Sequence, residues 1–229
     1  MSRREYNQYC AAARALDVLG ERWTLLLIRE LLIGPRRYTD LLKALPGIGT
    51  NLLADRLKGL EAAGVVQRSE LPPPAASSVY ELTERGTELE ESIVALARWG
   101  LPLLEERRPN DAWEPEWSIL AMRATFRPEA AKGVHEEYEF EVGGKVFFAA
   151  VNDGDVSTGP GAAKSPAVTL RADIETFLAV ANGSMPMQAA IESGRYVVDG
   201  DEAAFERCLR IFSLPERIRP KLYSKSCPT

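Results

Sequence analysis

The chain has 229 residues, 45% hydrophobic and 27% charged, a composition typical of one large or two ordinary globular domains. Its apolar runs fall far short of the ~18 residues of a membrane span and its first residues lack an apolar signal core, so we expect a cytoplasmic protein without a membrane segment. Three cysteines and one histidine without metal-ligand spacing predict no metal and no cofactor, and a net charge of −5 disfavours nucleic acid unless basic residues gather locally.

The first elements in chain order are helices. Apolar residues at three- and four-residue spacing predict helices over residues 10–19 and 22–32, broken at Gly20. A short amphipathic helix follows over residues 38–45, and another over residues 50–63 is closed by Gly64 as a left-handed C-terminal residue. Two helices joined by a short Gly-containing turn are typical of a helix-turn-helix.

A hairpin and a longer helical segment come next. Residues 65–70 and 79–83 read as two strands around a loop at residues 71–78, which makes the motif winged. We expect one helix over residues 84–104, with an apolar stripe formed by Leu89, Ile93, Leu96, Trp99 and Leu103. Such a stripe is usually core. Because the first half is small, the stripe can equally pair with a second subunit, and we favour a homodimer over a monomer.

The second half mixes strands and helices. A polar stretch at residues 106–112 contains Pro109, so we place domains at residues 1–107 and 115–225. Residues 138–142 alternate as a half-buried strand does, Gly143-Gly144 is a hairpin signal, and residues 145–151 are predicted to form the next strand. Further elements are a turn at 152–154, a strand at 168–170, a helix from Asp173 to Val180, a strand at 195–198 and a helix from Asp201. The fold class is therefore α+β: a mainly helical winged domain with a β-hairpin, then an α+β domain.

The helix that starts at Thr50 has two distinct sides. Leu53, Leu57 and Leu60 share an apolar side that should pack inward. The opposite side carries Asn51, Ala54, Asp55 and Lys58, at the spacing of a recognition helix. Asn can pair with adenine, Ala can touch a thymine methyl, and Lys can reach guanine or phosphate. A solvated helix side is the alternative, but the preceding turn and following hairpin favour double-stranded DNA.

Basic residues gather around this motif. Residues 1–110 hold 15 basic and 15 acidic residues, so the acidic excess lies in the second half, and residues 35–68 hold six basic against three acidic. Arg56 lies at the flank of the apolar side, where it either contacts phosphate or braces the fold by pairing with Asp40 or Glu61. The predicted DNA contacts are Arg36, Arg37, Thr50, Asn51, Ala54, Asp55, Arg56, Lys58, Arg68 at the base of the wing, and Ser77 and Ser78 in its loop.

The first half resembles the HxlR family of winged helix-turn-helix regulators, a branch near the MarR type, over about residues 8–104. Cys10 followed by residues 16–26, then residues 37–42, 53–64 and 79–86, carry this resemblance. It implies a homodimer on a palindromic operator, with the terminal helices as the interface. Two positions depart from the family pattern: Gly49, where Ser is common, puts one phosphate contact in doubt, and Ala11 replaces a common Pro.

The matching cysteine serves some HxlR-family members as a sensor of electrophiles or oxidants. The resemblance implies this role for Cys10, and Arg14, one turn away, would favour its reactive thiolate. The alternative is a small buried hydrophobic residue.

The second half is similar to the sterol-carrier-protein type-two fold, over about residues 115–214. Strands near residues 140–151 and the segments 170–173, 182–187 and 194–201 carry the similarity. Proteins of this fold hold an apolar ligand between sheet and helices. Phe148, Phe177, Met185 and Met187 either line such a cavity or form plain core.

These features predict a dimeric transcriptional regulator whose activity a small apolar effector modulates. The alternatives are a lipid or small-molecule carrier that uses its first half to dimerise, and a redox sensor acting through Cys10. We predict no enzyme, because His135 is isolated and neither a Gly-rich phosphate loop nor a nucleophile elbow is present. Strand alternation places the remaining acidic cluster on a solvent face: Glu136, Glu137, Glu139 and Glu141.

Overall fold

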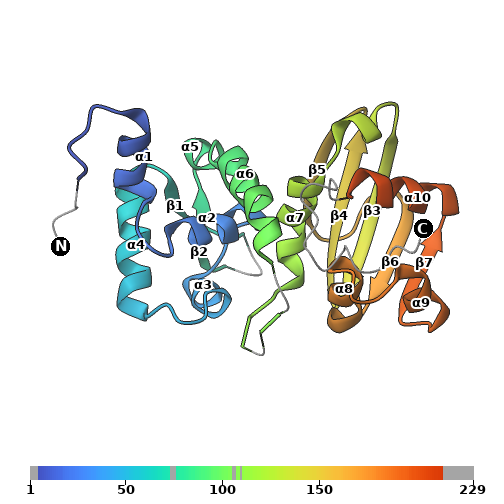
Figure 1. The fold of residues 1–229 in the computed structure, drawn as a ribbon. Coiled ribbons are helices and arrows are strands. Elements are labelled where there is room, and N and C mark those ends of the chain that lie inside the picture. Colours follow the sequence, from blue (N-terminus) through green and yellow to red (C-terminus); the bar gives the residue numbers. More distant parts are fainter. Residues whose placement is uncertain (1–4, 73–75, 105–106, 109, 214–229) are drawn as a thin grey trace. The chain divides into compact units, whose positions relative to one another are not determined.

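The computed structural model describes residues 5–72, 76–104, 107–108 and 110–213. The chain forms two compact units, Met1–Ile93 and Val94–Thr229 (Figure 1). The division falls inside helix α6 (Glu90–Gly100), upstream of the polar stretch at residues 106–112. Within the described part of the chain, no helix is both long and apolar enough to cross a membrane.

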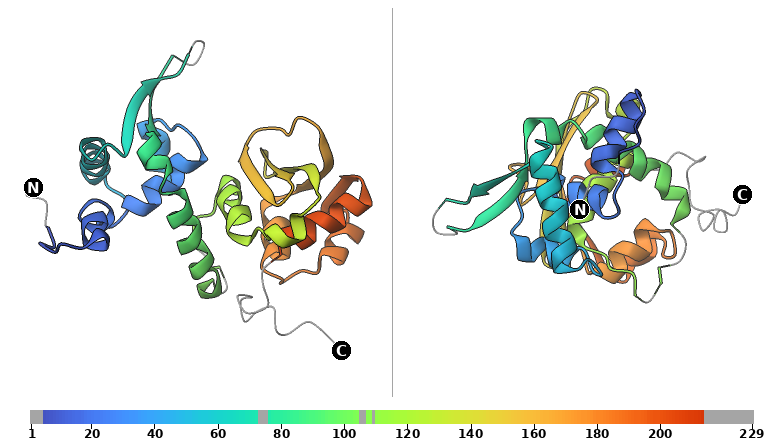
Figure 2. Two further views of the ribbon diagram at one scale, coloured as in Figure 1. Left: turned by 90° about the horizontal axis from the view of Figure 1, so that it is seen from above. Right: turned by 90° about the vertical axis from the view of Figure 1, so that its left-hand side faces the viewer.

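The first unit contains the predicted helix-turn-helix and hairpin. Its elements are α1 (Ala11–Leu19), α2 (Thr24–Ile33), α3 (Tyr38–Ala44), α4 (Thr50–Ala62), β1 (Val66–Glu70), β2 (Ser78–Leu82), α5 (Glu84–Thr87) and the start of α6. The hairpin is antiparallel, with Val66 opposite Leu82, and it projects from the helices in Figure 2. An isolated bridge between Arg36 and Tyr80 adds a short third strand segment to β2.

Leucine-rich sides of α2, α3 and α4 build the core of this unit. Leu27, Leu41 and Leu53 are all 0% exposed, and Val79 of the hairpin closes the same core. Burying each such side chain contributes roughly 1.5–3 kcal/mol, so the apolar side of α4 fixes which side of that helix remains open. Gly64 takes the left-handed conformation at φ 68°, as predicted for the end of α4.

The helix expected over residues 84–104 is broken, and this prediction was wrong. The Thr83 hydroxyl accepts a hydrogen bond from the Gly86 amide at 3.1 Å and caps the short α5. Gly86 is buried so closely against Val65 that a Cβ would overlap the Val65 carbonyl oxygen. This tertiary contact holds α5 against the start of the hairpin, and α6 begins again at Glu90 and runs into a 3₁₀ turn, η1 (Leu101–Leu103).

The second unit is a five-stranded sheet with helices on one side. Its strands are β3 (His135–Val142), β4 (Lys145–Asn152), β5 (Asp155–Pro160), β6 (Pro166–Ala172) and β7 (Tyr196–Gly200), in the order β5-β4-β3-β6-β7. β3 and β6 are parallel, and the other neighbours are antiparallel. Its helices are η2 (Pro115–Trp117), α7 (Ser118–Thr125), η3 (Pro128–Ala131), α8 (Ile174–Ala181), α9 (Met187–Glu192) and α10 (Glu202–Ile211). Figure 1 shows α8 and α10 in front of the strands.

Most predicted elements of this unit are present. Gly143 and Gly144 both have positive φ, as a tight hairpin turn requires, and Asp173 and Asp201 cap α8 and α10 with their carboxylates. The sequence analysis missed β5, α7 and α9.

Alternation along β3 separates a buried face from an open one. Tyr138, Phe140 and Val142 are buried beneath the helices, and the Tyr138 ring meets Phe212 edge-on at 6.1 Å. Glu136 shares this face, so its assignment to a solvent face was wrong. Its carboxylate instead accepts hydrogen bonds from Arg207 of α10 at 2.6 and 2.9 Å and from the Tyr138 hydroxyl at 2.6 Å.

The other three glutamates of β3 do lie on the opposite face. Glu137 and Glu139 there accept hydrogen bonds from the backbone amides of Ser165 and Ala163 at 2.8 and 2.9 Å. Glu141 pairs with Arg171 at 3.0 Å. Among the residues with described positions, no group of three or more metal-ligating side chains could hold a metal ion.

Candidate nucleic-acid interface

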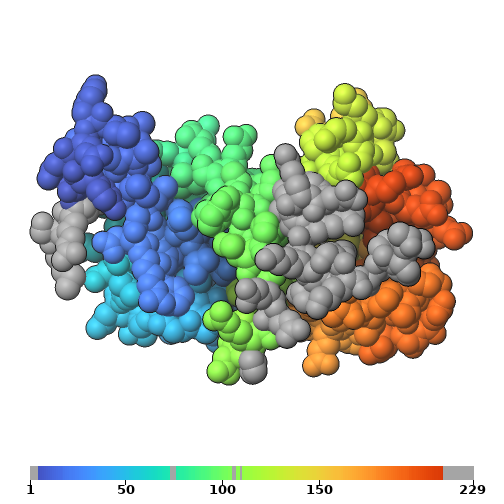
Figure 3. All heavy atoms as spheres, viewed as in Figure 1, coloured from blue at the N-terminus to red at the C-terminus, as the bar shows by residue number. Residues whose placement is uncertain are grey.

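The polar side of α4 is open. Leu53, Leu57 and Leu60 are at most 2% exposed, whereas Asn51, Ala54, Asp55 and Lys58 are all exposed on the opposite side. In Figure 3 the α4 region (cyan) lies at the surface of the unit. The structure therefore brings together the four side chains that the sequence assigned to DNA reading.

The start of α4 is held by a side chain that the sequence analysis missed. The Tyr38 hydroxyl donates a hydrogen bond to the Thr50 carbonyl oxygen at 2.7 Å, which ties the first turn of α4 to α3. Gly49 occupies the N-cap and provides no side-chain cap. The first amides of α4 therefore have no partner within the helix, the arrangement that suits a phosphate oxygen.

The wing is fixed to the start of α3. Arg37 donates a hydrogen bond from Nε to the Ser77 hydroxyl at 3.0 Å, across 40 residues of sequence. The backbones of Arg36 and Tyr80 exchange hydrogen bonds at 2.9 and 2.8 Å. Ser78 is the exposed first residue of β2. Arg37 and Ser77 thus lie side by side at the surface, a contact that no local sequence pattern predicts.

Two of the arginines predicted to contact DNA form ion pairs with acidic residues of the same chain. Arg56 forms an ion pair with Glu21 at 2.7 Å and donates to the Arg22 carbonyl oxygen at 3.3 Å, so it braces α4 against the α1–α2 corner. The predicted partners of Arg56, Asp40 and Glu61, were wrong, because Arg56 pairs with Glu21 instead. Glu61 pairs with Arg68 at 3.0 Å. The Arg68 guanidinium also lies 5.1 Å from the Tyr80 ring centre.

The α1–α2 corner also contains a strained aromatic residue. Trp23 precedes α2 with φ 80°, a conformation that costs a bulky residue about 1–2 kcal/mol. A Cβ built on Gly47 would meet the Trp23 ring at 3.7 Å, so this ring packs against the turn between α3 and α4. Helix α2 therefore begins at Thr24, later than the sequence predicted.

Cys10 lies exposed at the N-cap of α1. The backbone amides of Ala13 and Ala12, at the start of α1, lower the pKa of the exposed Cys10 thiol. The expected cause was Arg14, but that guanidinium pairs with Asp17 at 3.4 Å. The alternative of a buried hydrophobic residue is wrong for Cys10. Cys208, by contrast, is buried, and burial raises the pKa of its thiol. Cys227 lies outside the described residues.

The four residues proposed to line an apolar cavity do not all lie on the same face of the sheet. Phe148 pairs with Glu139 and packs over Gly159, on the sheet face away from the helices. Phe177 lies on the helix side, 6.5 Å from Phe147 between ring centres. The prediction placed the wrong phenylalanine of β4 inward, because a shift of one residue along a strand reverses its face.

The two methionines lie near the ends of the adjoining helices. Both Met185 and Met187 are half-buried, and the Met185 sulfur accepts a contact from the Arg195 guanidinium at 3.7 Å. Phe177, Met185 and Met187 thus remain the candidates on the helix side of the sheet.

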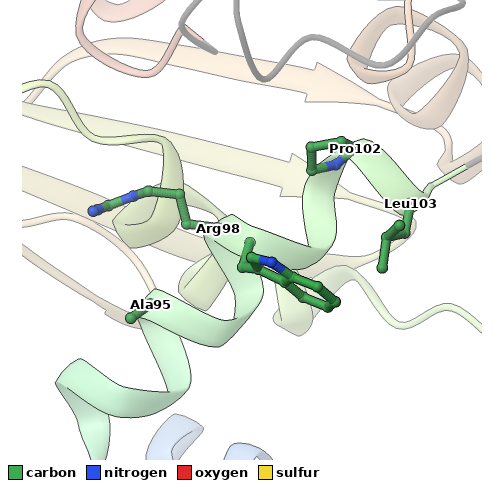
Figure 4. A pocket seen from close by; sticks show the side chains of 5 residues that line it. Ala95, Arg98, Pro102 and Leu103 are labelled. Atoms are coloured by element: carbon green, nitrogen blue, oxygen red, sulfur yellow. The ribbon is translucent and has the colours of Figure 1, made fainter.

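The stripe along α6 is largely uncovered within the chain. Ile93 is buried, but Leu96 is 47% exposed, Trp99 69% and Leu103 64%. Trp99 and Leu103 border an open hollow of about 520 Å³, shared with Ala95, Arg98 and Pro102 (Figure 4). A contiguous exposed apolar surface of this kind commonly marks a protein–protein interface.

The open polar side of α4, its buried leucine side and the adjacent hairpin define a winged helix-turn-helix protein with an α+β second unit. The model of the HxlR-like helix-turn-helix family matches residues 18–108, and that of the SCP-2 sterol transfer family matches residues 120–212. The chain belongs to the HxlR-like helix-turn-helix family.

Two relatives each match less than half of this chain. The HTH-type transcriptional regulator YodB of Bacillus subtilis is 38% identical over 85 residues, which are 37% of this chain and 76% of YodB. The uncharacterized HTH-type transcriptional regulator sll1512 of Synechocystis is 36% identical over 102 residues, 44% of this chain and 76% of that protein. Among solved structures, reduced B. subtilis YodB is 33% identical, with a TM-score of 0.37 and coverage of 44% of this chain and all of YodB.

Proposed function

We propose that this protein is a DNA-binding transcriptional regulator that acts as a homodimer on a palindromic operator. The observation that carries the proposal is the open polar side of α4, set beside the wing and opposite a fully buried leucine side. The names of its relatives, HTH-type transcriptional regulators, support the same role.

In this proposal α4 enters the major groove. Asn51 pairs with adenine, Ala54 contacts a thymine methyl and Lys58 reaches guanine or phosphate. The amide of Thr50 and the Arg37 guanidinium, beside Ser77, contact the DNA backbone on either side and set the register of the helix. Arg56 and Arg68, already paired with acids, contribute mainly to the position of α4 and the wing.

The DNA-binding test is a gel-shift titration of the full-length protein against its own upstream region. Wild type should bind with a sequence preference and a steep dependence on salt. Asn51→Ala and Lys58→Ala should each weaken binding, by about 1–3 kcal/mol where the side chain pairs with a base. Lys164→Ala, an exposed lysine of the second unit, is the matched control. Unchanged binding in both α4 variants would contradict the proposal.

The homodimer rests on the uncovered stripe of α6 and η1. A twofold pair would cover Leu96, Trp99 and Leu103 and present two copies of α4 to two half-sites. Sedimentation of Trp99→Ser/Leu103→Ser should show a monomer, with weakened operator binding. The control is Leu209→Ser, which changes an exposed leucine on α10. A double variant that stays dimeric would rule out this interface.

The second unit supplies the proposed effector site, and its match to the SCP-2 sterol transfer family supports an apolar ligand. Phe177, Met185 and Met187 are the candidate contacts on the helix side of the sheet. Native mass spectrometry of the purified protein tests for a bound ligand. Because coupling is reciprocal, a ligand that changes DNA affinity must bind more or less tightly when operator is present. A bound lipid in a protein without DNA affinity would instead favour the carrier function.

A second form of regulation is favoured by the position of Cys10. Its thiol is exposed at the start of α1, where backbone amides stabilise the thiolate. Oxidation or alkylation at this position would alter α1, which ends at Leu19, directly before the turn in which Glu21 and Arg22 hold Arg56. Operator binding by Cys10→Ser should then be insensitive to a quinone or hypochlorite that releases the wild type. Release of both proteins alike would exclude this role.

A further inference from the structure

A lone carboxylate lies in the middle of the open side of α4. Three acids occur among residues 35–68, and two of them have a stabilising environment. Asp40 lies in the first turn of α3, where the helix dipole favours negative charge, and Glu61 pairs with Arg68. Asp55 has neither: it is exposed in the second turn of α4.

The Asp55 carboxylate also makes no hydrogen bond or ion pair to any residue whose position is described. Lys58, one turn further along the same side, is exposed and lies outside ion-pair distance of it. The protein therefore does not neutralise this carboxylate internally, although its neighbours on α4 are suited to a polyanion.

The chemistry of the major groove restricts what a carboxylate can meet there. Most groups on the base edges are acceptors, namely guanine N7 and O6, adenine N7 and thymine O4, and these repel a carboxylate. The donors are the amino groups of cytosine and adenine. Adenine presents its amino group beside the N7 acceptor, a pair that suits an amide such as Asn51, whereas cytosine presents only its N4 amino group.

We propose that Asp55 determines sequence specificity by accepting a hydrogen bond from the N4 amino group of one cytosine in each half-site. This inference rests on the proposed function, in which α4 enters the major groove. Asn51 and Lys58 flank Asp55 on the same side and span about 10 Å along the helix, at roughly 1.5 Å per residue. That length corresponds to about three base pairs of duplex, so the cytosine lies next to the pairs read by Asn51 and Lys58.

The experiment is selection of binding sequences from a random DNA pool by the full-length protein. Wild type should select a C·G pair at one fixed position in each half-site. Asp55→Ala should lose the preference at that position only, a change of about 5- to 150-fold in competition between the correct and incorrect base. Asp55→Asn, which offers a donor, should shift the preference toward a base that presents an acceptor. Asp40→Asn is the matched control and should leave the selected sequence unchanged.

Chemical modification of the DNA gives a second measurement. Replacing the selected cytosine by N4-methylcytosine keeps its pairing with guanine and puts a methyl group in place of the N4–H donor in the major groove, so wild-type affinity should fall to that for an incorrect base. Asp55→Ala should not distinguish the two DNAs. If Asp55→Ala selects the same sequence as wild type, Asp55 does not read cytosine, although the protein is still a sequence-specific regulator. If wild type selects no sequence at all, the proposed function itself fails. Thermal unfolding should show all three variants folded, because none of these substitutions removes a buried side chain.

Discussion

Arg56→Met distinguishes a brace within the protein from a contact with DNA. The substitution keeps most of the aliphatic length of the side chain and removes the guanidinium that binds Glu21 and the Arg22 carbonyl oxygen. The ion pair with the exposed Glu21 is worth about 0.2–1 kcal/mol, and the backbone hydrogen bond about 0.5–1.5 kcal/mol. We therefore expect a loss of about 1–2 kcal/mol in the free energy of unfolding of the first unit.

The assay combines thermal unfolding with operator titration at several salt concentrations. A loss of this size lowers the melting temperature of a unit of this size by roughly 4–16 °C. The slope of log affinity against log salt should not change, because a brace releases no counterions from DNA. Removing a cation that binds one phosphate would instead reduce that slope by about 0.9.

Lys58→Met provides the opposite pattern for comparison. Lys58 is exposed and has no ion pair among the described residues, so its loss should leave stability within about 0.5 kcal/mol and reduce the salt slope. A double-mutant cycle of Arg56→Met with Glu21→Gln should return a coupling of about 0.2–1 kcal/mol. If Arg56→Met reduces the salt slope and leaves the melting temperature unchanged, Arg56 contacts phosphate, and the structural role assigned to it is incorrect.

Three further substitutions or treatments test other contacts. Gly86→Ala should destabilise the first unit by about 1–3 kcal/mol or more, because its Cβ would overlap the Val65 carbonyl oxygen, and a melting temperature equal to wild type would refute that close packing. Iodoacetamide should alkylate Cys10 at a pH below that needed for an ordinary thiol, since its pKa is lowered, and mass mapping of the modified peptide against pH measures this. Arg207→Met should destabilise the second unit at neutral pH. Burial raises the pKa of Glu136, but hydrogen bonds from Arg207 and Tyr138 lower it more, so this stabilisation is present above the usual carboxyl range and lost as pH falls through the lowered pKa. The difference in melting temperature between Arg207→Met and wild type should therefore shrink on acidification, and a constant difference would exclude the ion pair as its source.

Local patterns were sufficient to predict the open side of α4. Helical periodicity placed Leu53 and Asp55 on opposite sides without any knowledge of tertiary structure, and their exposures agree. The same holds for the caps at Asp173 and Asp201 and for the Gly143-Gly144 turn, where the residue type alone limits the backbone.

Contacts between distant residues could not be predicted in this way. The break after α5 depends on the approach of Gly86 to Val65, and the partner of Arg56 lies 35 residues earlier in the chain. Apolar residues occupy successive positions of β4 and so lie on both of its faces. The alternation that would show whether Phe147 or Phe148 points inward is therefore missing from the sequence. The left-handed conformation of Trp23, whose ring packs against the turn at Gly47, is likewise predicted by no feature of the local sequence.

The internal pairing of Arg56 with Glu21 and Arg68 with Glu61 has a consequence for how such a regulator searches a chromosome. Cations already paired with carboxylates of their own chain contribute little to the sequence-independent attraction of DNA phosphates. In the proposed function, discrimination between the operator and other DNA therefore falls to base reading by α4.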